Sequence, residues 1–449
     1  MLQYFHHYFY GDFVMKIAAI IAEYNPFHKG HQFQIEETRR LTGADYVLVV
    51  MSGDFVQRGA PALCNKYLRT KMALSGGADV VLELPSLYAI SSAEYFAQGG
   101  VTLLNKLGVI DYLSFGSECG DIQLMINCAK QLLSSTEQQE QQISDLVAKG
   151  LSYPLARQQV LLEALPAEND TFASTADAIK ALLSTPNNIL GLEYCKSLLA
   201  LNSNIEPVTI RRKGCEYHEN TLSEDNLHFA SASAIRHALN NNSADYLYHL
   251  PDTVAALFKE HQILDTFITE DDFSLLLYYK LLSEQNAGFT GYLDCSEELS
   301  FKIKKHLPEY RSFSQFCDLL KSKNLTYTRI SRTLLHILLN VKTPVAYSTP
   351  MQKRALDIPY ARLLGFRKDA SGVLSAIKKN SSIPLISNIA DATALLSEEG
   401  VAMLLQDIYA CDVYEAIFSQ KAAVICGNSC INSQKKEPLN EYKQSPVIV

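Results

Sequence analysis

The sequence predicts an α/β fold, in which a parallel sheet is covered by helices on both faces and is followed by a mainly helical region. Between residues 16 and 120, short and nearly continuous apolar runs alternate with longer amphipathic segments. This alternation is typical of parallel strands that are buried on both faces and joined by helices. Beyond about residue 245, apolar residues recur mostly at helical spacing. The pattern therefore predicts a second, helical part of the chain.

The composition is that of a folded protein. The chain has 449 residues, of which 47% are hydrophobic and 20% charged, enough for two or three domains with a sizeable core. No apolar run approaches the roughly 20 residues that span a bilayer, and residues 1–14 lack the features of a signal peptide. The ten cysteines include no CxxC pair, which favours free thiols over a metal site. We therefore expect a cytoplasmic protein.

Four apolar runs are expected to form the first strands of the sheet, at residues 16–22, 45–51, 79–84 and 111–115. The segments between them, and most of residues 121–205, have helical patterns. Further strands are expected at 205–212, within 357–366 and at 383–386. Ligands of such sheets bind beyond the carboxyl ends of the strands. The segments 26–31, 52–59 and 116–120 are therefore expected to line one site.

The segment after the first strand carries the strongest chemical signal. The strand is followed by Glu23-Tyr24-Asn25-Pro26 and then by Phe27-His28-Lys29-Gly30-His31, which precedes a helical pattern. A helix N-terminus binds anions through its unpaired N–H groups and its dipole, and a glycine lets backbone and ligand approach closely. The two histidines can donate hydrogen bonds to phosphate oxygens. A metal site is disfavoured, because no carboxylate or third histidine stands at HExxH-like spacing.

The residues His28-Lys29-Gly30-His31 resemble the HxGH signature of the HIGH-type nucleotidyltransferases, which attack the α-phosphate of ATP or CTP. The longer run EYNPFHKGH, with MSGDFVQRG at 51–59 and ARLLGFRKDASG at 361–372, resembles the bacterial tRNA(Met) cytidine acetate ligase family. This resemblance extends from near Met15 to about residue 420. It implies a Rossmann-like nucleotidyltransferase domain followed by a mainly helical, tRNA-binding domain.

The resemblance implies an ATP-dependent ligase that activates acetate as acetyl-adenylate and releases pyrophosphate. The acetyl group then passes to N4 of the wobble cytidine of elongator tRNA(Met), which forms N4-acetylcytidine. The implied partners are ATP, acetate and the tRNA, with Mg²⁺ accompanying the triphosphate; no protein partner is inferred. Two alternatives are a nucleotidyltransferase that acts on a small phosphorylated metabolite and an RNA-binding protein whose nucleotide site is regulatory or inactive.

By the same resemblance, His28 and His31 stabilise the transition state at the α-phosphate. The stretch Phe229–Arg236 resembles the ISSTxIR-type second signature of these enzymes. The residues expected to bind ATP are Ile21, Ala22, Glu23, Tyr24, Asn25, Pro26, Phe27, His28, Lys29, Gly30, His31, Gln32, Phe33 and Gln34, together with Gly116, Asn187, Arg212, Ser233 and Arg236. Three neighbours remain alternatives: Asn188 for Asn187, Arg211 for Arg212 and Ser231 for Ser233.

Other polar residues are open to two interpretations. Residues 52–59 are expected to form a mobile lip whose Gln57 and Arg58 hold acetate, pyrophosphate or substrate, or else an ordinary surface loop. Lys66, Arg69 and Lys71 either reach phosphates or are solvated. The net charge of −8 does not by itself indicate nucleic-acid binding. The chain also carries basic clusters that are either an ordinary solvated surface or, as the resemblance implies, contacts to the tRNA backbone. They comprise Lys302, Lys304, Lys305, His306, Arg329, Arg332, Lys353, Arg354, Arg362, Arg367, Lys368, Lys378 and Lys379.

The chain is accordingly divided into four parts. Residues 1–14 are expected to be an N-terminal extension, 15–244 the nucleotidyltransferase domain, and 245–431 a mainly helical tRNA-binding domain. Residues 432–449 are polar, contain two prolines and are expected to be a disordered tail.

Overall fold

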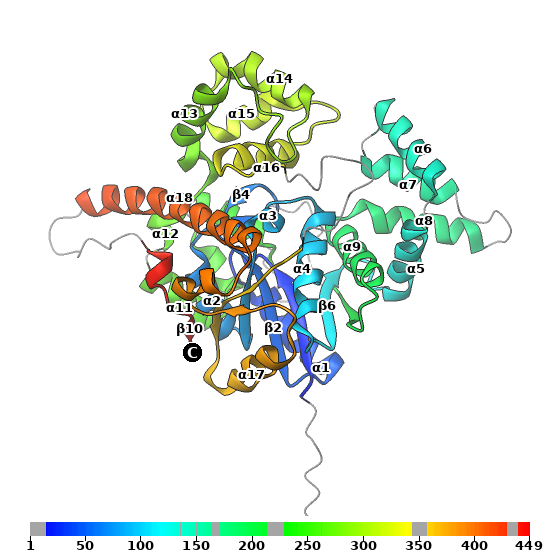
Figure 1. Ribbon diagram of the computed structural model, residues 1–449, viewed down its shortest axis with the longest axis horizontal. Coiled ribbons are helices and arrows are strands. Elements are labelled where there is room, and N and C mark those ends of the chain that lie inside the picture. Colours follow the sequence, from blue (N-terminus) through cyan, green and yellow to red (C-terminus); the bar gives the residue numbers. More distant parts are fainter. Residues whose placement is uncertain are drawn as a thin grey trace, which may run out of the picture.

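The computed structural model of the protein describes residues 15–134, 136–149, 151, 153–163, 171–212, 229–241, 243–261, 263–343, 357–428 and 439–449. The predicted N-terminal extension lies outside these ranges. The centre of the molecule is an eight-stranded sheet with the order β10-β8-β5-β2-β1-β6-β7 and β9 beside β8 (Figure 1). Its strands are β1 (Ile17–Ala22), β2 (Tyr46–Ser52), β5 (Val80–Leu84), β6 (Tyr112–Ser117), β7 (Glu206–Arg211), β8 (Ala361–Phe366), β9 (Leu385–Ile386) and β10 (Val447–Ile448).

The first five of these strands are parallel, as the apolar runs predicted. β1 lies in the middle, paired with β2 from Ile17↔Tyr46 to Ala22↔Met51 and with β6 on its other side. The chain therefore winds outward from β1 in both directions. The carboxyl ends of β1 and β6 form the topological switch point where α/β sheets bind ligands. The predicted fold class is confirmed.

Alternate residues of the strands feed two hydrophobic cores, one on each face of the sheet. On one face, Ile17, Ala19 and Ile21 pack with α4 (Ala93–Leu107), α5 (Ile122–Leu133), α9 (Pro186–Ala200) and α17 (Ser371–Asn380). On the other face, Ile20 packs with α1 (Lys29–Thr42), α2 (Lys66–Ser75), α10 (Ala232–Asn240) and α11 (Asp252–Glu260). Both faces are therefore dry, which explains why the strands read as continuous apolar runs.

A third core belongs to a compact helical unit, drawn at the top of Figure 1, that contains α13 (Ser274–Glu284), α14 (Glu297–His306), α15 (Phe313–Leu320) and α16 (Tyr327–Leu338). This unit joins the rest of the molecule through Phe55, Ile90 and the long helix α18 (Glu398–Asn428). The remaining helices are α3 (Ser86–Ala89), α6 (Glu137–Ala148), α7 (Tyr153–Glu163), α8 (Thr171–Ser184) and α12 (Ile263–Thr266). Among the described residues, no helix is long and apolar enough to cross a bilayer.

Two predictions about domain organisation are wrong. The predicted boundary at residue 245 does not separate the sheet from the helical unit, because α11 covers the sheet and β8, the strand expected within 357–366, pairs antiparallel with β5 inside it. The tail is not disordered over residues 439–449. Its strand β10 pairs with β8, and the carboxylate of Glu441 is buried against Lys66 and Arg362. These long-range partners supply the order that the polar sequence of the tail does not suggest.

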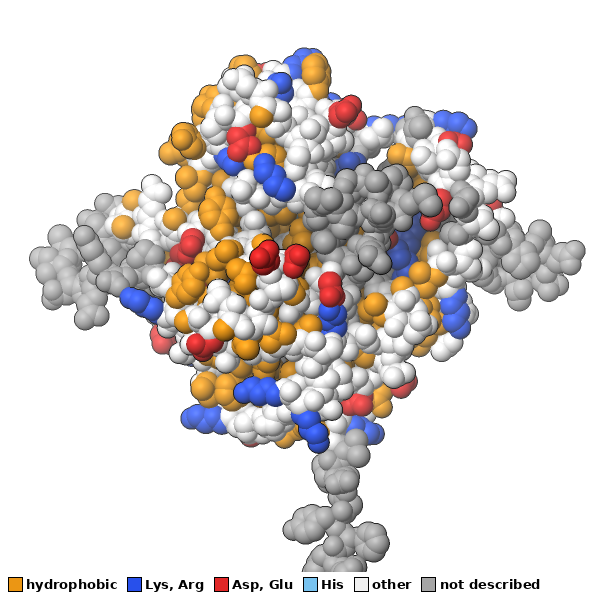
Figure 2. Space-filling model, viewed as in Figure 1, with side chains coloured by type: hydrophobic (Ala, Val, Ile, Leu, Met, Phe, Trp, Pro, Cys, Tyr) orange, Lys and Arg blue, Asp and Glu red, His pale blue; other side chains and the backbone are white. Residues whose placement is uncertain are grey.

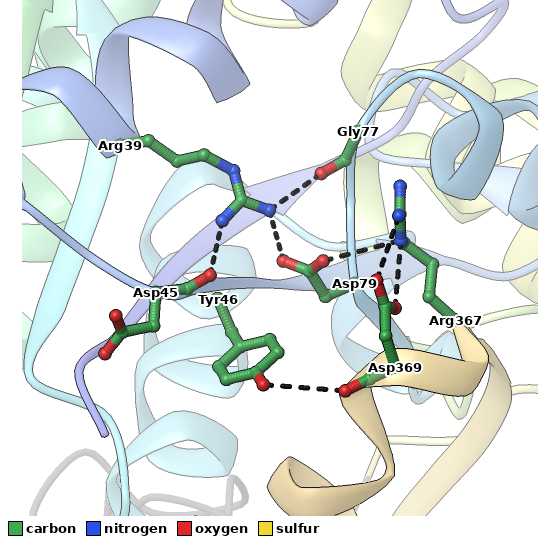
Figure 3. A pocket seen from close by; sticks show the side chains of 7 residues that line it. All are labelled: Arg39, Asp45, Tyr46, Gly77, Asp79, Arg367 and Asp369. Carbon is green, nitrogen blue, oxygen red and sulfur yellow. Dashed lines mark hydrogen bonds and ion pairs between the residues drawn. The ribbon is translucent and has the colours of Figure 1, made fainter. Parts of the chain in front are cut away.

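At the amino edge of the strands, the sheet is closed by ion pairs around a small pocket (Figure 3). Arg39 of α1 binds Asp79, which precedes β5, and donates to the carbonyl oxygens of Asp45 and Gly77. Arg367, which follows β8, binds Asp369 and approaches Asp79. The cations that line this pocket are thus already engaged by carboxylates, and the edge has a structural role.

Candidate active site

The sequence between β1 and α1 places both histidines at the switch point. His28 is the N-cap of α1, with an extended backbone, and its Nδ1 accepts a hydrogen bond from the N–H of Gly30 at 3.1 Å. Nδ1 of His31 in turn accepts from the N–H of His28 at 3.3 Å. The imidazole rings are stacked, with centroids 3.7 Å apart. The pair therefore forms a reciprocal capping box made of two histidines.

This capping arrangement fixes the tautomer of both rings. Because Nδ1 of each ring accepts a backbone N–H, the proton of the neutral ring must be on Nε2. Both residues then present an Nε2–H donor beyond the helix N-terminus, where the dipole also favours an anion. The site is thus built to donate hydrogen bonds to a negatively charged group.

Burial and positive neighbours keep both imidazoles neutral. Burial lowers the pKa of His28 well below its ordinary value, and His31, Arg212, His249 and Arg236 lower it further. Burial, followed by the charge of Arg212, lowers the pKa of His31 to about 3. Burial is the larger cause of both shifts, and the nearby guanidinium groups add a positive potential that an anionic ligand would neutralise.

The structure separates the predicted arginine alternatives. Arg212 directly follows β7, its backbone N–H donates to the carbonyl of Ser117 at 2.9 Å, and its charge acts on both histidines. A Cβ at Gly116 would lie 3.4 Å from Cγ of Arg212, so this glycine packs against the arginine stem. Arg211 instead packs beside Gly120. The geometry therefore brings Arg212, rather than Arg211, to the histidine pair.

The second signature is also resolved residue by residue. Ser231 is the N-cap of α10, and its hydroxyl accepts from the N–H of Ala234 at 3.1 Å. Ser233 accepts from Arg236 at 3.2 Å, and the same guanidinium donates to the carbonyl of Asn25 at 2.6 Å. Arg236 thereby joins α10 to the turn that carries the histidines. Ser231 has a capping role, whereas Ser233 lies with Arg236 at the site.

The asparagine pair at the start of α9 has divided roles. The side-chain oxygen of Asn188 accepts the N–H groups of Glu118 and Cys119 at 2.9 and 3.1 Å, and the residue is buried. Asn187 is less buried and donates to the Glu118 carboxylate at 2.6 Å. Asn188 therefore fixes the loop after β6, and Asn187 is the member of the pair that a ligand can reach.

Gly30 is required for a reason other than the expected approach of a ligand. A Cβ at this position would lie 2.9 Å from Cε1 of His28 and 3.3 Å from Cβ of Phe229. The glycine thus makes room for the capping imidazole. Phe229 in turn stacks on Phe33 of α1, with ring centroids 5.3 Å apart.

The predicted lip is an ordered hairpin. Its strands β3 (Phe55–Val56) and β4 (Ala60–Pro61) pair antiparallel, and Phe55 is buried against Phe273 and Tyr414. The N–H of Gln57 donates to the Glu23 carboxylate at 3.0 Å, whereas the side chain of Arg58 is exposed. The segment is therefore a hairpin anchored on the helical unit and not an irregular surface loop, while the contacts of Gln57 and Arg58 with a ligand stay a prediction.

Lys66 and Arg69 neither reach phosphates nor face solvent, so both interpretations of them are wrong. Lys66 is fully buried, with its amine 2.8 Å from Glu83 and 3.0 Å from Glu441. Arg69 is also fully buried and donates to the backbone carbonyls of Glu23, Ser52 and Gly53. It thereby ties the ends of β1 and β2 together beneath the site.

Two further basic residues have different outcomes. The side chain of Lys71 is partly exposed, which agrees with the solvated interpretation, and its amine lies 3.8 Å from Glu260. Arg362 was expected to contact RNA, yet it is 3% exposed and pairs with Glu83 and Glu441. Lys353 and Arg354 lie outside the described residues.

Sequence reasoning missed one segment at the site. Lys29 of α1 donates to the carbonyl of Tyr248 at 2.6 Å, and the adjacent His249 lies close enough to act on the pKa of His28. The Tyr248 side chain is 76% exposed. The signal was weak, because a Tyr-His pair within a helical pattern is unremarkable until the fold brings residue 249 to residue 28.

Comparisons with known proteins agree with this architecture. The HIGH Nucleotidyl Transferase family model matches residues 15–426. A tRNA(Met) cytidine acetate ligase of Clostridium perfringens is 37% identical over 401 residues, which cover 89% of this chain and 95% of the relative. The ligase of the same name from Clostridium kluyveri is 41% identical over 381 residues, covering 84% and 90% respectively.

Solved structures also match this chain over nearly its whole length. The crystal structure of Thermotoga maritima TmcAL bound with alpha-thio ATP matches with a TM-score of 0.81 and 26% identity, covering 97% of this chain and all of that one. The apo form matches with a TM-score of 0.84 over the same shares. The chain therefore belongs to the HIGH nucleotidyl transferase family and, within it, to the tRNA(Met) cytidine acetate ligases.

Proposed function

We propose that this protein is an ATP-dependent ligase that makes acetyl-adenylate and transfers its acetyl group to N4 of the wobble cytidine of elongator tRNA(Met). One observation carries the proposal: two neutral imidazoles with fixed Nε2–H donors, that of His28 buried and that of His31 half-buried, stand beside Arg212 and Arg236 at the switch point of the sheet. The family membership and the ATP-analogue-bound neighbour support it. Because the proposed reaction uses ATP and tRNA, we infer that it takes place in the cytoplasm.

In the first step, an acetate oxygen bonds to the α-phosphorus while the bond from phosphorus to the bridging oxygen of the β-phosphate breaks. Pyrophosphate leaves, and negative charge develops on the equatorial oxygens. Nε2–H of His28 and of His31 donates to these oxygens, and Arg212 neutralises charge nearby. Since the rings are already oriented by their capping bonds, they need little reorganisation as the charge develops.

In the second step, N4 of the cytidine attacks the acetyl carbonyl carbon. The bond from that carbon to the phosphate oxygen breaks, AMP leaves and N4 loses one proton. Ser233 and Arg236 are assigned to the pyrophosphate portion of ATP, while Asn187 and the backbone at Gly116 contact the nucleoside. The residues from Ile21 to Gln34 form the strand end, the turn and the first turns of α1 around it.

Mg²⁺ would enter with the nucleotide and be held mainly by its phosphate oxygens, where it offsets negative charge. Among the described residues, no group of three or more His, Cys, Asp or Glu side chains gathers as a ready-made metal site. The donor set fits a cation that the triphosphate itself carries. The chain's own residues would then supply the anion contacts.

The test is ATP–pyrophosphate exchange by the purified protein with and without acetate, in the absence of tRNA. We expect exchange that requires acetate, that is lost in His28→Ala and that persists in the matched control His237→Ala, whose side chain lies on α10 and bonds Asn241. Exchange that is unaffected by His28→Ala would overturn the assignment of the histidine pair. Exchange with a phosphorylated metabolite, but with no carboxylate, would favour a small-molecule nucleotidyltransferase instead.

A further inference from the structure

A second pocket lies on the helical unit, between α14 and the loop that precedes it. It has a volume of about 620 Å³, and its walls include Gly288, Thr290, Phe301, Lys304 and Lys305. Figure 1 places α14 at the outer end of this unit, away from the sheet. The pocket is therefore distinct from the histidine site.

The geometry of α14 turns an aromatic ring and two cations outward together. Leu299 and Ile303 are fully buried in the helical core, whereas Phe301 is 67% exposed. Lys304 and Lys305 follow Phe301 at spacings of 3 and 4 residues, so the three side chains share one face of the helix. Phenylalanine is normally buried, and its exposure here beside two lysines is unusual. Figure 2 shows hydrophobic and basic side chains side by side over this helix.

The wall opposite the helix is held in place. The hydroxyl of Ser300 accepts the N–H of Phe289 at 3.0 Å, and the ring of Phe289 is fully buried. Gly288 adopts a positive φ of 78°, which turns the chain at the rim of the pocket. The pocket is therefore built on the core and does not depend on a loose loop.

The positive charges of Lys304 and Lys305 are available to a ligand. On the same helix, Lys302 pairs with Glu298 at 3.3 Å. Within the described part of the chain, no carboxylate lies within ion-pair distance of Lys304 or Lys305. Glu297, at the first turn of α14, also lines the pocket and offers an acceptor for an exocyclic amine.

We infer that this pocket takes one unpaired nucleobase of the RNA substrate, which stacks on Phe301 while Lys304 and Lys305 contact the adjoining phosphates. An exposed aromatic ring next to unpaired cations is the arrangement with which proteins hold single-stranded nucleotides. The inference rests on the proposed function, and it specifies a contact with the RNA that is remote from the histidine pair.

The experiment compares full-length Phe301→Ala, Phe301→Tyr and the double variant Lys304→Ala/Lys305→Ala with the control Tyr279→Ala. Tyr279 is an aromatic residue of α13 that is 72% exposed and does not line the pocket. Two quantities are measured: the Kd for unmodified elongator tRNA(Met) at several salt concentrations, and acetate-dependent pyrophosphate exchange without tRNA.

Phe301→Ala is expected to weaken tRNA binding by about 5- to 150-fold, the usual range for one stacked base, while Phe301→Tyr and the control bind as the wild type does. The double lysine variant is expected to lower the slope of log K against log salt by about two. Exchange should be unchanged in all variants, which also shows that they fold.

Equal tRNA affinity of Phe301→Ala and wild type would overturn the inference and leave the proposed function intact. Loss of exchange together with binding in Phe301→Ala would overturn it too, because the residue would then support the fold. Failure of the wild type to exchange or to bind tRNA would instead refute the proposed function and, with it, this inference.

Discussion

Replacing Glu441 with glutamine should destabilise the whole molecule, although this residue lies eight positions before residue 449. The carboxylate is 1% exposed; Lys66 lies 3.0 Å away, and Tyr67 and Arg362 donate hydrogen bonds to it. Both cations are buried, and the other carboxylate between them is Glu83, at 2.8 and 3.4 Å. The substitution leaves the two buried cations to share Glu83, with the carboxylate of Asp54 farther off, 4.0 Å from the Lys66 amine.

The magnitude follows from this imbalance. Removing one partner of a buried ion pair lowers the free energy of unfolding by about 3 to 5 kcal/mol, because the remaining buried charge is neither paired nor hydrated. The glutamine oxygen still accepts one hydrogen bond, so we expect a loss of about 3 kcal/mol in the free energy of unfolding. The matched control is Asp318→Asn, which breaks a surface pair with Lys321 at 3.2 Å. Its side chains are more than half exposed, so it should cost less than about 1 kcal/mol.

The assay is chemical denaturation followed by far-ultraviolet circular dichroism, since the chain contains no tryptophan for indole fluorescence. The pH dependence provides a second readout. Burial opposes ionisation of Glu441, but Lys66 and Arg362 together lower its pKa below the ordinary value. The stabilisation should therefore be complete above about pH 5, the upper side of the unfolded carboxyl pKa of about 4.3, and should be lost as the pH falls through the folded pKa. The difference between wild type and Glu441→Gln should shrink over this acid range.

If Glu441→Gln unfolds at the same denaturant concentration as Asp318→Asn, the reasoning is refuted. A difference in stability that stays constant from pH 7 to pH 3 would also contradict it, because the effect would then not arise from the charge of the carboxylate.

Three further predictions concern the active site and its surroundings. Asn188→Ala removes the acceptor of two part-buried backbone N–H groups and should lower the free energy of unfolding by about 1 to 3 kcal/mol. Asn187→Ala should instead raise the KM for ATP in pyrophosphate exchange and leave thermal melting unchanged; the reverse pattern would exchange their roles. Gly59→Ala should cost more than about 2 kcal/mol in thermal or chemical unfolding, since φ is 81° and a Cβ would lie 2.4 Å from the backbone of α16. The control Gly291→Ala, which has nothing within 4 Å of its Cβ, should melt normally, and equal melting of the two would contradict this packing. His28 should stay neutral in the free enzyme because its pKa is lowered. We therefore expect kcat/KM for ATP to be constant from pH 8 down to about 5.5. An inflection near pH 6.5 that disappears in His28→Gln would instead show that His28 titrates with the ordinary pKa of a histidine and would contradict this prediction.

Local sequence patterns were sufficient to predict the sheet and the edge of it that carries the candidate active site. The run from Ile17 to Ala22 is apolar at every position because both faces of this strand are buried. The residues that follow it lie near those that follow β6, because the two strands are parallel neighbours and end at the same edge of the sheet. Gly30 and the histidines stand close together in sequence, so their contact needs no long-range information. The prediction of the fold class, which depended on such short segments, is confirmed, whereas the roles of the site residues stay predictions.

The errors arise where the partner of a residue is distant in sequence. Lys66 and Arg69 have the spacing of a solvated helix face, and nothing near them indicates that Glu441 and the end of β2 will enclose them. The prediction of a disordered tail rests on polar composition, yet Glu441 in the tail is buried against cations from two other segments. Hydrophobic patterns do not reveal buried charge networks of this kind, because each charged residue in the sequence looks like a surface residue.

The order in which the sheet is assembled has a consequence for synthesis of the protein. β5 is complete at residue 84, but the strand that covers its free edge begins at residue 361 and carries Arg362, and Glu441 follows still later. On the ribosome, the N-terminal portion therefore waits with an open strand edge and with Glu83 and Lys66 lacking their final partners. Open edges of this kind invite pairing with other chains. The nascent protein can cover this edge of β5 only after β8 has been translated, so a chain that stops before residue 361 leaves the ribosome with that edge exposed.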